Sequence, residues 1–202
     1  MAKITNTGVF IVEGSAAAAD VAGSSQIWVK SDTPSSLYHT DDAGNDLRMG
    51  GWMVSAEQSP TSGTSVDFTG IPSGVRNIKI LFDAISLNGS EDLELELGDS
   101  GGIETSGYVS MAENGNTRTA NTTSLQISSS GDASHAYTGQ INLALEDVTN
   151  NTWCSFGILR HNDSNISLSG GSKTLSATLD RLRIKSSGSN TFDAGSLSIM
   201  YQ

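Results

Sequence analysis

The segment Leu93-Glu94-Leu95-Glu96-Leu97 decides the fold class, because apolar and acidic side chains alternate in it without a break. Successive side chains of a β-strand point to opposite faces, so the pattern predicts a strand with one face in a core and one in water. Glu94 and Glu96, about 7 Å apart on the outer face, could imitate the carboxylate pair of a glycosidase. A solvated strand face is the simpler interpretation of the two glutamates.

Short apolar runs of the same kind recur along the chain and are separated by Gly, Ser and Asn turns. Eight or so strands in the segment 56–202 predict an all-β fold, an antiparallel β-sandwich of jelly-roll type. We expect the long polar interval 110–136 to form exposed loops with one short strand near 124–127. The composition of 55–65 is that of a linker and places the domain boundary. The other predicted strands lie at 75–85, 140–145, 153–159, 166–168, 175–184 and 197–201.

Residues 24–49 predict a small β-meander of three strands that precedes the sandwich. Its main apolar side chains are Trp28, Leu37 and Tyr38. Three strands with so little apolar surface are marginally stable alone. We therefore expect the N-terminal module, residues 1–55, to attach to another protein through these three side chains.

The composition disfavours several classes of protein. Charged residues make up only 16 % of the chain, and this shortage of Glu, Lys and Arg disfavours helical surfaces. The 22 acidic and 11 basic residues leave a net charge of −11, which disfavours binding to nucleic-acid phosphates. No apolar run approaches the ~20 residues that span a bilayer, so we expect no membrane insertion. The single cysteine, Cys154, excludes an intrachain disulfide, and we expect its side chain to be buried.

One motif suggests catalysis, because Gly98-Asp99-Ser100-Gly101-Gly102 resembles the nucleophile segment of trypsin-like serine proteases. His39 precedes Ser100 by only about 60 residues, too few for the protease architecture, and lacks the sequence context of that family. The motif also follows a predicted strand directly, where it is ordinary turn chemistry. The other histidines, His135 and His161, have no second ligand at metal-binding spacing. We therefore expect no enzyme, no metal site and no cofactor.

Five short sequence segments, which we call phrases, resemble structural proteins of tailed bacteriophages. The N-terminal phrases resemble a module of such virion proteins, and the later ones resemble the jelly-roll domains of phage fibre and head-fibre proteins. The N-terminal phrases are ADVAGSSQIWVKSDTP at 19–34 and LYHTDDAGND at 37–46. The later phrases are FTGIPSGV at 68–75, LGDSGGIETSGY at 97–108 and TFDAGSLSIMY at 191–201.

The resemblance implies a non-enzymatic virion structural protein, a surface-displayed head fibre or capsid decoration protein that forms a homotrimer. The N-terminal module would then bind other virion proteins of the capsid or tail. The polar segment 1–5 shows no signal-peptide core, which fits assembly in the host cytoplasm. The alternative is a tail-fibre receptor-binding protein that recognises a host surface glycan, with Tyr108 and Tyr137 as candidate contacts. Either tyrosine could equally pack at a strand end or a subunit contact.

Overall fold

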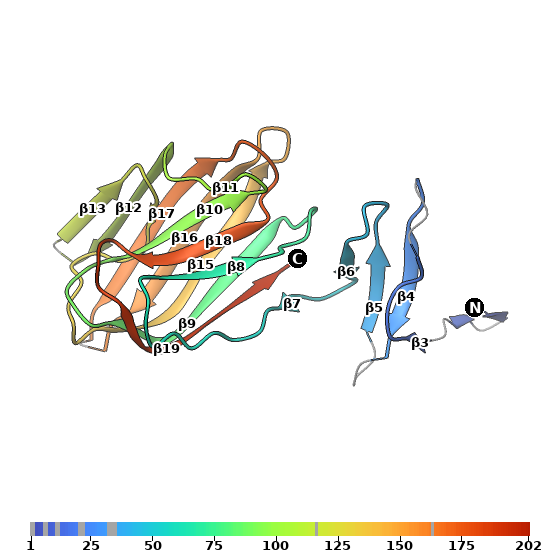
Figure 1. Cartoon of the computed structure of the whole chain (residues 1–202), viewed down its shortest axis with the longest axis horizontal. Helices are drawn as coiled ribbons and strands as arrows, with labels where there is room; N and C mark the ends of the chain where they lie inside the picture. The colour runs from blue at the N-terminus through green and yellow to red at the C-terminus, as the bar shows by residue number, and fades with distance from the viewer. Residues whose placement is uncertain are drawn as a thin grey trace. The chain divides into compact units, whose positions relative to one another are not determined.

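The computed structural model describes residues 3–5, 8–10, 13–19, 23–31, 36–115, 117–162 and 164–202 (Figure 1). The chain forms two compact units, Met1–Met53 and Val54–Tyr201. All regular secondary structure among the described residues is β-strand, which confirms the all-β prediction. Residues 20–22 and 32–35, part of the N-terminal phage-like phrases and of the turn beside them, lie outside the described residues.

The first unit contains the predicted meander within a four-stranded sheet of order β3-β4-β5-β6. Strands β4, β5 and β6 are antiparallel neighbours, and β3 adds to β4 in parallel. A separate antiparallel pair, β1 with β2, lies nearer the N-terminus. The bounds are β1 (Lys3–Thr5), β2 (Gly8–Phe10), β3 (Glu13–Gly14), β4 (Gln26–Lys30), β5 (Ser36–Thr40) and β6 (Asp46–Arg48).

The second unit is built from two antiparallel sheets, one large and one small, that lie over each other (Figure 1). The large sheet has the order β13 (Thr117–Asn121), β12 (Tyr108–Asn114), β17 (Ile166–Thr174), β16 (Thr152–Arg160), β15 (Ala136–Asp147), β9 (Asn77–Leu87), β19 (Phe192–Tyr201) and β7 (Met53–Val54). The small sheet has the order β11 (Gly102–Ile103), β10 (Leu93–Asp99), β18 (Arg181–Ser186) and β8 (Ser65–Thr69), with β14 (Leu125–Gln126) also paired to β10.

One apolar core fills the space between the two sheets. Leu93, Leu95 and Leu97 of β10 enter it from the small sheet, and alternate residues such as Ile78 and Ile80 of β9 enter it from the large sheet. This arrangement agrees with the predicted antiparallel sandwich, because each sheet buries one face against the other. The chain crosses between sheets at several points, whereas β15, β16 and β17 follow one another as hairpins within the large sheet.

Three predictions about local structure need correction. The predicted strand 175–184 begins only at Arg181, although Leu175 and Leu179 in the connection before it are buried in the core. The interval 110–136 is not mainly exposed loop, because it contains strands β12, β13 and β14. The predicted linker 55–65 is paired at its start, where the Ser55 N–H donates to the Ile199 carbonyl over 2.9 Å.

The polar interval could be buried because its own side chains supply hydrogen bonds. The Ser110 hydroxyl donates to the Ser124 carbonyl over 2.9 Å and accepts from the Gln126 N–H over 2.9 Å. The Ser128 hydroxyl accepts from the Leu93 N–H over 2.7 Å. Buried polar groups are tolerated when such partners satisfy them, so a composition rich in Ser and Asn does not by itself indicate a solvated loop.

Candidate functional site

The predicted attachment residues divide between the two faces of the first unit's sheet. Trp28 and Tyr38 lie directly opposite on β4 and β5, and their rings stack with centroids 5.1 Å apart. The Trp28 indole N–H donates to the Thr40 hydroxyl over 2.8 Å. Both rings are buried, so the expectation that they need an external partner to cover them is wrong. Leu37 lies on the opposite face with Ile27, and both are exposed.

The two predicted glycan contacts are also buried, with Tyr108 2 % and Tyr137 1 % exposed. The Tyr108 hydroxyl donates to the Glu104 carbonyl over 2.7 Å and accepts from the Leu97 N–H over 2.8 Å. Its desolvation raises the pKa of the Tyr108 phenol. Tyr137 packs edge-on against His161, with ring centroids 4.7 Å apart. Neither ring can stack on a sugar, so the structure contradicts the glycan contacts and agrees with the alternative interpretation, in which each tyrosine packs at the end of a strand.

The Gly-Asp-Ser-Gly-Gly motif forms the tight connection between β10 and β11, as the turn interpretation predicted. Asp99 pairs with Gly102 across this hairpin, and Ser100 is exposed at its tip. The Asp99 carboxylate accepts from the Ser176 hydroxyl over 2.7 Å and from the Gly101 N–H over 2.8 Å. These bonds, the one from Ser176 above all, lower the pKa of the Asp99 carboxyl. The motif therefore has a structural role in the turn.

Glu94 and Glu96 are not solvated, which corrects the interpretation of the alternating segment. Both carboxylates are buried on the outer side of the small sheet. The Lys185 ammonium on β18 lies 2.8 Å from Glu94 Oε2 and 3.9 Å from Glu96 Oε1. Arg183 pairs across strands with both Glu96 and Asp67, and its guanidinium donates two hydrogen bonds to Asp67. Burial raises the pKa of the Glu96 carboxyl. Cross-strand ion pairs therefore cover this part of the small sheet's outer side.

The fold brings His135 and His161 together although they are far apart in the sequence. Their ring centroids lie 4.6 Å apart, and His161 Nε2 lies 2.8 Å from the Ser167 hydroxyl oxygen. Sequence spacing missed this pair because the two residues become neighbours only through the pairing of β15 with β16. Within the described ranges, no group of three or more His, Cys, Asp and Glu side chains could hold a metal ion.

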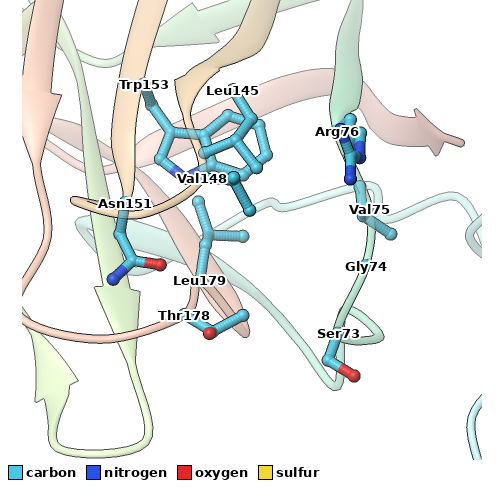
Figure 2. A pocket seen from close by; sticks show the side chains of 10 residues that line it. All are labelled: Ser73, Gly74, Val75, Arg76, Leu145, Val148, Asn151, Trp153, Thr178 and Leu179. Carbon is cyan, nitrogen blue, oxygen red and sulfur yellow. The ribbon is translucent and has the colours of Figure 1, made fainter.

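A small pocket lies at one end of the sandwich (Figure 2). The segment from Ser73 to Arg76 forms one side of it, and the Trp153 indole lies on the other with Leu145 and Leu179. Its volume is about 130 Å³, whereas pockets for small molecules usually occupy ~300–1,000 Å³. The pocket therefore has room for a group the size of one amino-acid side chain.

The outer side of the large sheet carries most of the exposed large apolar side chains of the second unit. Six large apolar side chains on β12, β16 and β17 point away from the core and are exposed to solvent. We call this surface the outer apolar face. Its members and their exposed fractions are Val109 72 %, Met111 47 %, Phe156 63 %, Ile158 50 %, Ile166 45 % and Leu168 41 %.

The strand register makes these six side chains one continuous surface. Ile158 pairs with Leu168 across β16 and β17, and Gly170 pairs with both Phe156 and Met111. Because Gly170 has no side chain, a shallow hollow of about 320 Å³ remains there, lined by Met111, Glu113, Leu168, Ser169 and Gly170. The outer apolar face is therefore a patch of bulky side chains with an indentation near its centre.

In β12 and β17 a buried serine lies between two exposed apolar side chains. Ser167 is fully buried and contacts His161, while Ile166 and Leu168 on either side of it are exposed. Ser110 is likewise buried between the exposed Val109 and Met111. A solvated sheet normally shows the opposite alternation, so these two strands present apolar side chains where a second surface could cover them.

Cys154 lies beside this face and is exposed, so the expectation of a buried thiol is wrong. Trp153 takes the inward position on β16 and is buried. Neighbouring residues of a strand point to opposite faces, which places Cys154 outside with Phe156.

The outer apolar face carries little negative charge. The charged residues of its three strands are Glu113, Arg160 and Lys173. Glu113 forms an ion pair with Arg118 of β13 at 2.8 Å, and Lys173 is buried in an ion pair with Glu104. In a chain with a net charge of −11, this face is therefore close to neutral.

No family model, curated protein or solved structure matches this chain. Within the part of the chain that the structure describes, no helix is long and apolar enough to cross a lipid bilayer. The outer apolar face is the candidate functional site, because contiguous exposed apolar patches of this size are often functional.

Proposed function

We propose that this chain is a non-enzymatic structural protein of a tailed-bacteriophage virion, displayed on the particle surface as a head fibre or capsid decoration protein. The outer apolar face is the observation that carries the structural part of the proposal. The phage-like phrases of the sequence support the virion context. The jelly-roll type, the homotrimer and assembly in the host cytoplasm belong to the same proposal.

An assembly role explains why the outer apolar face exists. Exposed apolar side chains are favourable only when another surface removes them from water. Protein interfaces have apolar centres depleted of charge and enriched in Phe and Met, and Phe156 and Met111 lie near the middle of this face. An active site instead needs convergent polar groups in a cleft, and the outer apolar face presents few of them.

The first unit supplies a second surface for binding to capsid or tail proteins. Ile27 and Leu37 are exposed on the sheet face opposite the stacked Trp28 and Tyr38. Attachment through this face replaces attachment through the two aromatic rings. Leu37 is the one of the three predicted attachment residues that stays available to a partner.

One observation favours the alternative, a tail-fibre protein that binds a host surface glycan. Phe156 exposes 63 % of its surface, and an exposed aromatic ring can stack on the apolar face of a sugar. Its neighbours Ile158 and Leu168 are aliphatic and offer no hydrogen bonds to sugar hydroxyls. The structural role is therefore the better supported of the two.

Purified particles of the virus that encodes this chain test the proposal. We expect mass spectrometry to detect the chain in intact particles and cryo-electron microscopy to locate it on their surface. A chain that stays in the soluble lysate and is absent from washed particles contradicts the virion role. Adsorption to host cells distinguishes the alternative: Phe156→Ser lowers adsorption of glycan-binding particles, but leaves adsorption unchanged if the chain only decorates the capsid.

A further inference from the structure

We propose that the outer apolar face is the contact surface between copies of this chain, and that Gly170 allows the facing copy to approach the sheet closely. This inference deepens the proposed function, because it names the partner that covers the face on which that function rests. Three observations support a second copy as the occupant: the area of the face, its charge, and the glycine at its centre.

The exposed apolar area matches that of a stable protein interface. With ordinary side-chain areas, the six exposed fractions correspond to roughly 500 Å² of apolar surface, near the top of the range for a typical monomer. An interface of standard size buries about 800 Å² on each partner, of which ~56–65 % is apolar. The outer apolar face alone therefore supplies the apolar area that one standard interface needs.

The charge distribution allows copies to meet at this face. Two copies of a chain with a net charge of −11 repel each other, and the repulsion is strongest where acidic surfaces face. On the outer apolar face Glu113 is paired with Arg118, and Arg160 is exposed at the end of β16. An apolar and nearly neutral surface can also face a second copy of the chain without placing like charges opposite each other.

Gly170 is not required by the packing of its own chain. A Cβ atom placed there would meet only the Ser155 carbonyl oxygen, at 3.7 Å, which is ordinary contact. At the neighbouring Gly171, by contrast, a Cβ would lie 2.6 Å from the Ser110 side chain. Glycine inside a strand is destabilising and often marks close approach by another backbone or ligand. A facing copy that enters the hollow at Gly170 accounts for a glycine that the chain's own fold does not need.

The mass of the purified full chain in solution tests the inference, measured by sedimentation equilibrium over a range of concentrations. We expect the wild type to sediment as two or three chains. Phe156→Glu should convert it to a monomer, with self-association weakened at least tenfold, because a carboxylate would be buried at the centre of the contact. Val148→Glu is the matched control, since Val148 is 60 % exposed but lies outside the outer apolar face. It should leave the mass unchanged.

Gly170→Val provides a second and independent variant. A Cβ at this position makes only ordinary contact with its own chain, and valine favours a strand, so the circular dichroism spectrum should stay that of the wild type. The added side chain fills the hollow, so the variant should nevertheless become monomeric. This result separates a contact role from a structural one, and it decides the question if Phe156→Glu fails to fold.

Three results would overturn the inference: a monomeric wild type, an oligomer that survives both outer-face substitutions, or equal dissociation of the Val148→Glu control. The proposed function fails by a different measurement. A monomeric chain that is present on washed particles contradicts the contact between copies and the homotrimer, but leaves the virion role standing. An oligomeric chain that is absent from particles contradicts only the virion role.

Discussion

Ile199→Ala tests whether β19 is an integral part of the sandwich. Ile199 is 2 % exposed and pairs with Ile80 of β9. The substitution removes three carbon groups from the core, worth ~0.8 kcal/mol each in transfer free energy. Incomplete collapse of the cavity adds to this, and buried Ile→Ala changes cost ~2–5 kcal/mol. We expect a loss of about 3 kcal/mol from a free energy of unfolding of ~5–15 kcal/mol.

Urea unfolding of the full chain, followed by circular dichroism at one fixed protein concentration, measures this loss. With a denaturant slope of ~1–3 kcal/mol per molar urea, the midpoint should fall by about 1 M or more. Val148→Ala serves as the control, because Val148 is exposed and exposed sites usually change stability by less than ~0.5 kcal/mol. If Ile199→Ala shifts the midpoint no more than the control does, β19 is peripheral and the packing argument is wrong.

Three further predictions follow from the same structure. Deletion of residues 197–202 should unfold or aggregate the second unit, because it removes Leu197 and Ile199 from the core and exposes the backbone of β9; melting temperature and solubility measure this. Ser100→Ala should leave the melting temperature and particle association unchanged, since Ser100 is exposed at a turn, and loss of a hydrolytic activity with the fold intact would contradict the turn role. Asp99→Asn should destabilise the chain more at pH 7 than near pH 3. The pKa of the Asp99 carboxyl is lowered in the folded state, so its contribution is present above its ordinary value of 3.8 and lost as the pH falls through the folded value. Urea midpoints of both chains at the two pH values give the comparison.

Much of the fold could be read from local patterns. The alternation of Leu93, Leu95 and Leu97 predicts β10 because these side chains must share one face of a strand. The same reasoning located β19 and the hairpin of β4 with β5. The glycines around Ser100 predicted a turn, since a short Gly-rich segment after a strand favours reversal of the chain. Each of these features depends on residues that are close together in the sequence.

The outer apolar face could not be predicted from such local patterns. Strand β16 carries apolar residues on both faces, with Trp153 and Leu159 on one and Phe156 and Ile158 on the other. Alternation shows that the two pairs separate, but not which pair enters the core. In β17 the pattern misleads, because Ser167 is buried and Leu168 is exposed. The buried serine is acceptable only because His161, placed by the end of β16, satisfies its hydroxyl.

The sequence by itself thus determined the elements whose side chains segregate by polarity, such as β10 and β19. It also determined turns such as the one at Ser100, and the division between the first unit's meander and the sandwich of the second unit. Only the tertiary structure decided which face of each strand became the core, because that choice depends on partners that are distant in the sequence. It buried Tyr108 and Tyr137, which had been candidate contacts. It also exposed Phe156 and Ile158, because Trp153 takes the inward position on β16 and neighbouring residues of a strand point to opposite faces. Burial is a property of the assembled sheets, so a surface for partners became visible only once the sheets were in place.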